Sequence, residues 1–211
     1  MTSTPEQVRS VLSLAPVVPV VVLDSVAHAV PVARALVAGG VPVVELTLRT
    51  PVALDAIRAI ASSVPEITVG AGTVTSPRQA EAAYDAGAQF LVSPGLTPAL
   101  LAGMRETGLP FLPGTATVSE VLAALEAGCT ELKFFPAEAS GGAAYLRSIA
   151  SVVPTARFCP TGGITAASAP AYLALDNVGC VGGSWLTPAD ALAAGDWDRV
   201  TRLAAAAAAL G

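Results

Sequence analysis

The chain has 211 residues, of which 53% are hydrophobic and 13% are charged, and its net charge is −5. This length and composition fit a single folded domain over residues 1–211 and exclude a disordered chain. The acidic balance, with no run of basic residues, argues against a nucleic-acid partner or an anionic membrane as partner.

In chain order, residues 5–13 predict an extra N-terminal helix, and short runs of β-branched or aromatic residues then predict eight strands. These strands are expected to begin near Val17, Val43, Ile67, Phe90, Phe111, Leu132, Arg157 and Gly179. Alanine-rich amphipathic stretches between them predict helices, among them residues 30–37, 51–61, 77–86, 98–106 and 119–127. Residues 204–209 predict a terminal helix, because alanine has the highest helix propensity.

The regular alternation of strand and helix predicts an α/β fold with parallel strands. Glycines follow the helical stretches and prolines lie near helix starts, as Gly128 and Pro98 do, which agrees with this division. Eight such units in one chain of this length predict a (β/α)8 TIM barrel with an extra N-terminal helix. A doubly wound open sheet is the alternative.

One residue is unusual in its chemistry. Arginine supplies all the other basic side chains of the protein, and Lys133 is the single lysine. Arginine can replace lysine at most surface positions, but it cannot form an imine with a carbonyl group. Lys133 is therefore a candidate nucleophile.

Two strands are expected to place charged side chains inside the barrel. Because side chains alternate along a strand, Glu45 points to the face opposite Leu46, and Lys133 points to the face opposite Phe134. The second and sixth strands both have even numbers, so these two side chains can lie in one layer and face each other. Burial favours the neutral form of an amine, which is the form that attacks a ketone, and a carboxylate beside it can act as general acid and base. A purely structural ion pair is the other interpretation, although a buried pair often adds no net stability.

The last two strands carry a different signal at their carboxyl ends. Thr161-Gly162-Gly163 follows the seventh strand, and Gly182-Gly183-Ser184 follows the eighth. In this barrel the phosphate site lies at the ends of these two strands, where glycines let backbone N–H groups approach an anion. Thr161 and Ser184 can add hydroxyl donors. We predict a phosphate-binding site here, although a single Gly-Gly pair usually marks only a turn.

A carboxylate site is expected beside it. Thr73 follows the third strand, and Arg49 lies one strand away. The planar guanidinium group of arginine binds carboxylates well, so the two side chains could hold a carboxylate together. Thr73 could equally be a helix cap or a turn residue.

The remaining chemistry-bearing residues give little signal. Cys129, Cys159 and Cys180 are too few and too scattered for a disulfide framework or a zinc site, so we expect small buried side chains in a reducing cytoplasm. No cluster of ligating residues suggests a metal, and His28, the single histidine, is expected to be a solvated helix residue. The N-terminus lacks the positive stretch of a secretory signal, and the longest apolar run is too short for a membrane helix. A cytoplasmic location and no membrane contact are therefore expected.

Six segments of the sequence form a joint pattern: residues 45–50, 70–74, 93–95, 133–137, 160–164 and 182–185. Taken jointly and in order, these segments resemble the 2-keto-3-deoxy-6-phosphogluconate (KDPG) aldolase and 4-hydroxy-2-oxoglutarate aldolase family. This is a family of class I aldolases that includes an enzyme of the Entner–Doudoroff pathway. The resemblance spans nearly the whole chain, with no departure at a motif position.

The resemblance implies a role for each site residue. Lys133 would form an imine with the C2 ketone of the substrate, and Glu45 would be the general acid/base, acting through a water. Arg49 and Thr73 would bind the substrate carboxylate. The other implied substrate-binding residues, of which Phe135 packs beside the imine and the rest hold the distal phosphate end, are Phe135, Thr161, Gly162, Gly163, Gly183 and Ser184.

The resemblance further implies a phosphorylated keto-acid substrate, cleaved to pyruvate and glyceraldehyde 3-phosphate, and activity on 4-hydroxy-2-oxoglutarate. The protonated imine is the electron sink, so no metal and no cofactor are implied. A homotrimer is implied as well. The alternatives are an aldolase for the galactonate epimer, a non-covalent phosphate-binding barrel isomerase or synthase, and a non-catalytic binding protein. Thr161 favours the gluconate epimer, since galactonate-specific members tend to have an aliphatic residue there.

Overall fold

The computed structural model describes residues 10–211 of the chain. Most of the helix predicted over residues 5–13 therefore lies outside the described residues. Its last part, Val11–Ser13, forms a short 3₁₀ helix, η1.

The described residues alternate between strands and helices along the whole chain. The strands within residues 10–211 are β1 (Val17–Val21), β2 (Val43–Thr47), β3 (Thr68–Gly72), β4 (Leu91–Val92), β5 (Phe111–Leu112), β6 (Gly114–Thr115), β7 (Glu131–Phe134), β8 (Arg157–Pro160) and β9 (Val181–Gly183). The helices within the same range are η2 (Val26–His28), α1 (Ala29–Ala38), α2 (Ala53–Ser63), α3 (Pro77–Asp85), α4 (Pro98–Glu106), α5 (Val118–Glu126), α6 (Gly142–Ile149), α7 (Ala169–Leu173), α8 (Ala189–Ala194) and α9 (Trp197–Ala208). The strand starts, and the helices predicted between strands, are confirmed to within a few residues, whereas the terminal helix predicted over residues 204–209 begins earlier, at Trp197.

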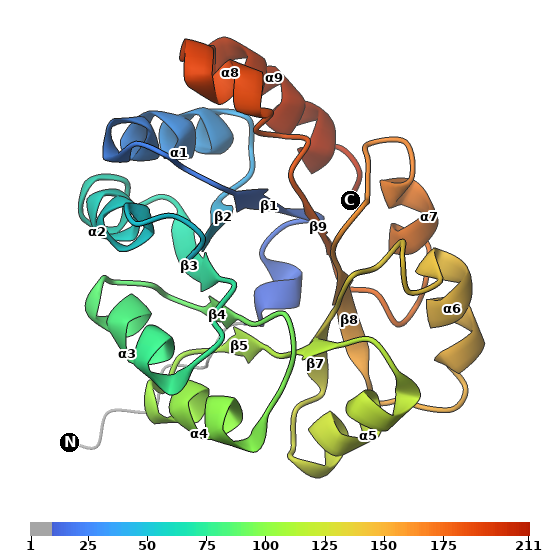
Figure 1. The fold of residues 1–211 in the computed structure, drawn as a ribbon. Coiled ribbons are helices and arrows are strands. Elements are labelled where there is room, and N and C mark those ends of the chain that lie inside the picture. The colour runs from blue at the N-terminus through green and yellow to red at the C-terminus, as the bar shows by residue number, and fades with distance from the viewer. Residues whose placement is uncertain (1–9) are drawn as a thin grey trace, which may run out of the picture.

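The strands are parallel and form an α/β fold curled into a half-barrel. Their hydrogen bonds define a six-stranded sheet in the order β5-β4-β3-β2-β1-β9 and a three-stranded sheet in the order β6-β7-β8. Strands lie in the middle of the molecule with helices α1 to α7 around them, and α9 packs on α1 (Figure 1). Strand β2 is buried along its whole length, as expected for a parallel strand with helices on one side and a filled interior on the other.

The predicted fifth strand is divided by Pro113. Residues Phe111–Leu112 form β5 and pair with β4, whereas Gly114–Thr115 form β6 and pair with β7. Proline has no backbone N–H, so it cannot donate to a ladder at this point. The carbonyl of Pro113 still accepts from the Lys133 amide, at 2.9 Å, which holds β7 beside this segment.

Local signals in the sequence explain why the helices begin where they do. The hydroxyl groups of Ser76 and Thr97 accept hydrogen bonds from the first turns of α3 and α4, and a proline follows each of them. The C-terminal helix α9 is joined to α1 by the Thr201 hydroxyl, which donates to the Ala35 carbonyl at 3.1 Å. No helix within residues 10–211 is long and apolar enough to span a bilayer.

Candidate active site

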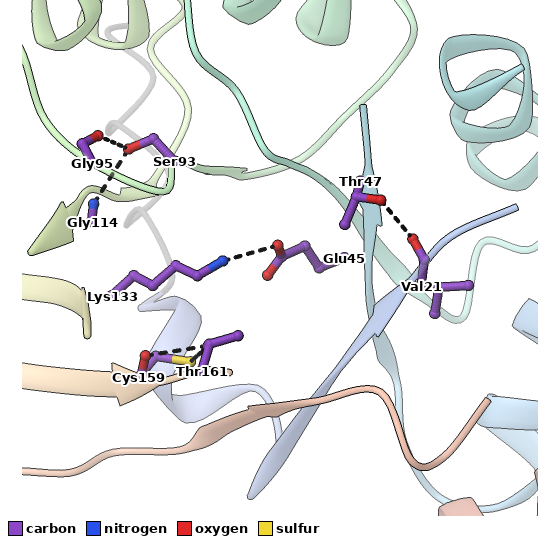
Figure 2. A network of polar contacts seen from close by, with 9 residues as sticks. All are labelled: Val21, Glu45, Thr47, Ser93, Gly95, Gly114, Lys133, Cys159 and Thr161. Atoms are coloured by element: carbon purple, nitrogen blue, oxygen red, sulfur yellow. Dashed lines mark hydrogen bonds and ion pairs between the residues drawn. The ribbon is translucent and has the colours of Figure 1, made fainter. Parts of the chain in front are cut away.

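A buried ion pair lies in the interior of the strands. The Nζ atom of Lys133, on β7, is 3.5 Å from Oε1 of Glu45, on β2. Both residues are buried, with 5% and 2% of their surfaces exposed. The two side chains extend toward each other from opposite strands, with Thr161 and Cys159 to one side (Figure 2). The expected juxtaposition of these residues is therefore present in the structure.

The Lys133–Glu45 pair is flanked by the ring of Phe135 and by Gly72. The ring centre of Phe135 lies 5.2 Å from Nζ of Lys133, within the range of a cation–π contact. On the other side, the Glu45 side chain passes so close to Gly72 that a Cβ atom there would overlap its carboxylate. The absence of a side chain at Gly72 is thus a condition for the position of Glu45.

A pocket of about 190 Å³ opens at the carboxyl ends of the strands. It is lined by Val20, Val22, Arg49, Phe135, Thr161, Gly162, Gly163, Ile164, Gly182, Gly183 and Ser184. The structure thus brings together every predicted substrate-binding residue except Thr73. The sequence analysis missed Val20, Val22 and Ile164. Val20 lies opposite Glu45 in the β1–β2 register, but an entirely apolar strand shows no alternation that would have indicated its inward face.

The loop after β8 has a backbone suited to an anion. Gly162 and Gly163 both have left-handed conformations, with φ of 104° and 81°. The carbonyls of Thr161 and Gly162 accept hydrogen bonds from the Ala137 and Glu138 amides, at 2.8 and 3.1 Å. Because the C=O and N–H of a trans peptide unit point in opposite directions, the Gly162 and Gly163 amides face away from Ala137 and Glu138.

Neither of these two glycine amides donates a hydrogen bond within residues 10–211. Successive free N–H groups in a tight turn are typical of an anion-binding nest. Ser184, which also lines the pocket, has an exposed side chain that can add a hydroxyl donor. The arrangement can therefore bind a phosphate or another small anion.

Thr161 connects this loop with the buried pair. Its hydroxyl lies 3.5 Å from the Cys159 carbonyl, and a Cβ atom on Gly182 would overlap it. Cys159 in turn lies opposite Lys133 in the β7–β8 register. The Thr161 hydroxyl therefore lies in the interior, between the glycine loop and the strand position opposite Lys133.

Thr73 and Arg49 lie at the carboxyl ends of β3 and β2. Thr73 has φ of 58° and is the only residue other than glycine with a positive φ in residues 10–211. A β-branched residue in this conformation is strained, and such strain often occurs at functional sites. The cap of α3 is Ser76, so Thr73 is not a helix cap. No hydrogen bond joins Thr73 to Arg49 within the described residues, and Thr73 does not line the pocket.

His28 and the three cysteines do not line the pocket. His28 lies at the N-cap position of α1 without a capping hydrogen bond from its side chain, and it contacts Trp197 edge to face, with ring centres 5.6 Å apart. All three cysteines are buried and free, as predicted. A hydrogen bond with Cys159, together with burial, raises the pKa of Cys180 well above its ordinary value. No group of three metal-ligating side chains occurs within residues 10–211.

Comparisons with known proteins agree with this geometry. A model of the family described as KDPG and KHG aldolase matches residues 8–203. Over 196 residues the chain is 57% identical to the KHG/KDPG aldolase of Escherichia coli strain K12, which covers 93% of this chain and 92% of that protein.

Two solved structures are similar over almost their whole length. The KDPG aldolase of Legionella pneumophila, with pyruvate captured as a covalent carbinolamine intermediate, has a TM-score of 0.91 and 44% identity, covering 93% of this chain and 96% of that one. The KDPG aldolase of Zymomonas mobilis ZM4 with 3-phosphoglycerate has a TM-score of 0.89 and 48% identity, covering 95% and 94%.

The fold and site define a parallel α/β protein with a buried lysine–glutamate pair and a glycine loop whose two amides are free within residues 10–211. Its sequence is related to that of aldolases over most of its length. The chain belongs to the KDPG and KHG aldolase family.

Proposed function

We propose that this protein is a class I aldolase that cleaves KDPG to pyruvate and glyceraldehyde 3-phosphate. It also cleaves 4-hydroxy-2-oxoglutarate to pyruvate and glyoxylate. The observation that carries the proposal is the 3.5 Å contact between the buried Nζ of Lys133 and the Glu45 carboxylate. The carbinolamine in the Legionella relative supports it, because that intermediate is the adduct of an amine with a ketone.

Lys133 is the nucleophile of the proposed reaction. Its neutral amine attacks the C2 ketone to give a carbinolamine, which loses water to form a protonated imine. The imine nitrogen then accepts the electron pair of the C3–C4 bond as that bond breaks. Because the imine is itself the electron sink, the reaction requires no metal and no cofactor. The ring of Phe135, whose centre is 5.2 Å from Nζ, packs beside the imine.

Glu45 moves the protons of the proposed reaction. Its carboxylate is placed to receive the proton that the Lys133 ammonium must lose before it attacks, and it returns this proton to the carbinolamine hydroxyl as water leaves. During cleavage Glu45 takes the proton of the C4 hydroxyl, through a water, and the aldehyde leaves. It then returns a proton to C3 of the enamine, and hydrolysis of the resulting imine releases pyruvate and restores the amine.

The two ends of the substrate are held by different groups. Arg49 and Thr73 bind the carboxylate next to the ketone, as the guanidinium geometry favours. At the distal end the free amides of Gly162 and Gly163, with Ser184, hold the phosphate. The family resemblance supports all of these assignments, and the lining of the pocket supports all of them except Thr73. Gly183 lines the pocket next to Ser184.

Thr161 supports the gluconate epimer over the galactonate epimer. Its hydroxyl faces the interior between the phosphate loop and Lys133, where it can donate to a hydroxyl group of the sugar acid. An aliphatic side chain at this position cannot do so. The ratio of cleavage rates for the two epimers tests this assignment.

We further propose that residues 1–211 form one domain and that the barrel is closed. The single bridge between Thr161 and Gly182 supports closure between β8 and β9. At the other seam, β5 and β6 are separated only by Pro113 and together occupy the place of one strand. Eight strands then surround the Lys133–Glu45 pair.

Assembly and location follow from the family resemblance. We propose a homotrimer in the cytoplasm, where three buried free thiols fit a reducing compartment. Light scattering coupled to size-exclusion chromatography measures the mass directly. A mass of three chains of 21.0 kDa is expected, and a monomer would contradict the proposal.

Borohydride trapping tests the proposed function. The protein is incubated with pyruvate, reduced with borohydride, digested and analysed by peptide mass spectrometry. A reduced adduct on the peptide containing Lys133, the only lysine, is expected. Only the N-terminal amine competes with it, and its peptide is resolved separately.

The Lys133→Arg variant is the matched control for trapping and for activity. It keeps the positive charge opposite Glu45 but cannot form an imine. Loss of both the adduct and cleavage is expected. Cleavage that survives the substitution would contradict the covalent mechanism and favour the non-covalent phosphate-binding barrel instead.

A further inference from the structure

Behind the glycine loop lies a pair of residues without a role in the proposed chemistry. Glu138 follows β7 in the turn before α6, and Tyr172 lies on α7. The Tyr172 hydroxyl donates to Oε1 of Glu138 at 2.7 Å. Neither residue lines the pocket.

Glu138 contacts the loop through both its backbone and its side chain. Its amide donates to the Gly162 carbonyl at 3.1 Å. Its Cβ and Cγ lie so near Gly163 that a Cβ atom built on that glycine would be 2.8 Å from each of them. The backbone contact is on the side of the loop opposite the Gly163 amide, since that amide points away from the Gly162 carbonyl that accepts from Glu138.

Tyr172 fixes the other end of the same loop. The chain runs from β8 through Gly162 and Gly163 into α7, where Tyr172 turns back to the Glu138 carboxylate. Tyr172 is only 1% exposed, so its ring is held by the core rather than by solvent-facing contacts. The carboxylate of Glu138 is thereby tied to the helix that begins where the loop ends.

The hydroxyl of Tyr172 remains a donor throughout the neutral range. Burial and the hydrogen bond to the Glu138 carboxylate raise the pKa of Tyr172 above its ordinary value. A charge-assisted hydrogen bond of this kind is stronger than one between neutral groups. The pair is therefore a firm connection between the β7 turn and α7.

We propose that Glu138 and Tyr172 are positioning residues that hold the Gly162–Gly163 amides in the geometry required by the substrate phosphate. This inference rests on the proposed function of the loop. Fixed amides need no rearrangement when the anion binds, and a loosened loop must be ordered at the expense of affinity. The pair should therefore affect phosphorylated substrates and leave unphosphorylated ones unchanged.

The experiment compares KM and kcat for KDPG and for 4-hydroxy-2-oxoglutarate. Tyr172→Phe removes only the hydroxyl group, and we expect KM for KDPG to rise about five- to tenfold with little change in kcat. KM for 4-hydroxy-2-oxoglutarate, which has no phosphate, should stay within about twofold. Tyr145→Phe is the matched control, because no hydrogen bond of the Tyr145 hydroxyl occurs within residues 10–211 and its ring stacks on Phe134.

Two substitutions of Glu138 separate positioning from general damage to the fold. Glu138→Gln keeps the stem and an oxygen that accepts from Tyr172, so KM for KDPG should remain within about twofold of the unmodified protein. Glu138→Ala removes both, and KM for KDPG should rise at least as much as in Tyr172→Phe. Thermal unfolding of each variant reports whether the fold is retained.

The outcomes distinguish this inference from the proposed function. If the unmodified protein cleaves neither substrate, both are wrong. If it cleaves both, but Tyr172→Phe and Glu138→Ala leave KM for KDPG unchanged or raise the two KM values equally, only the positioning role is wrong. A rise confined to KDPG, with rescue in Glu138→Gln, supports it.

Discussion

The carboxylate of Glu45 occupies the space that a side chain at Gly72 would fill. The two residues are on neighbouring strands, in a register that pairs Glu45 with Gly70 and Thr47 with Gly72. A Cβ atom on Gly72 would overlap Oε1 of Glu45, the same oxygen that lies 3.5 Å from Nζ of Lys133. The glycine at the end of β3 therefore allows the position that the proposed acid/base on β2 adopts.

Gly72→Ala tests this relationship. The added methyl group must displace Glu45, because the three atoms nearest to it all belong to that side chain, and the proton transfers then lose their alignment. We expect kcat to fall by at least about tenfold, and overpacking to lower the free energy of unfolding by about 1–3 kcal/mol. Steady-state kinetics and urea unfolding measure the two effects.

Gly95→Ala provides the control for Gly72→Ala. A Cβ atom on Gly95 meets nothing within 4 Å, so the same chemical change should leave kcat and stability near their original values. Equal losses in the two variants would show that the effect at Gly72 does not come from Glu45.

Ser184→Asp tests the phosphate end of the pocket. A carboxylate beside a bound phosphate costs about 4 kcal/mol at a separation of 4 Å and an effective dielectric of 20, so KM for KDPG should rise by at least about tenfold. KM for 4-hydroxy-2-oxoglutarate should change much less. Ser151→Asp adds the same charge at an exposed position away from the pocket and should change neither value. An unchanged KM for KDPG in Ser184→Asp would place the phosphate elsewhere.

Much of the fold follows from local patterns in the sequence. Alternating apolar runs and helical stretches predict the strand starts, and capping residues such as Ser76 and Thr97 set the helix starts. The division of the fifth strand at Pro113 was not predicted. Pro113 interrupts the ladder locally, but the pairing of one half with β4 and of the other with β7 involves strands distant in the sequence, which no local pattern indicates.

In the site, too, local patterns predict single residues but not contacts between distant segments. Glu45 and Lys133 could be predicted because charged residues stand out in apolar strands and alternation fixes their direction. Val20 could not, since its strand is apolar on both faces. The contact between Glu138 and Tyr172 joins a turn to a distant helix, and neither residue belongs to a pattern that the sequence analysis used.

Thr73→Gly separates strain from binding. Thr73 adopts φ of 58°, which glycine reaches without steric cost. Relief of strain should offset the greater freedom of glycine in the unfolded chain, so the free energy of unfolding should not fall and should rise by up to about 1 kcal/mol. KM should nevertheless rise about tenfold for both substrates, because both carry the carboxylate that the Thr73 hydroxyl is proposed to bind.

Thr155→Gly is the control for this change. Thr155 is exposed in a turn and has no positive φ, so glycine there should lower the free energy of unfolding by up to about 1 kcal/mol and leave KM unchanged. If Thr73→Gly destabilises the protein as much as Thr155→Gly does, its conformation stores no strain. If KM is also unchanged, Thr73 does not bind the carboxylate.

The capping box at the start of α5 predicts a pH dependence of stability. Hydrogen bonds from the backbone of Ala116, and then from Thr117, lower the pKa of Glu120 below its usual value of 4.5. A carboxyl group with a lowered pKa in the folded state stabilises the protein when it is ionised in both states. That contribution is therefore present above pH 4.5 and is lost as the pH falls through the lowered pKa of the folded state.

Glu120→Gln should accordingly lower the free energy of unfolding at neutral pH, and its difference from the unmodified protein should shrink as the pH falls below 4.5. Thr117→Ala, which removes the other half of the box, should cost about 0.5–2 kcal/mol. Urea unfolding from neutral to acidic pH measures both. Glu66→Gln, at an exposed position outside any helix, should show no such pH dependence. A Glu120→Gln difference that stays constant or grows toward acidic pH would contradict the assignment.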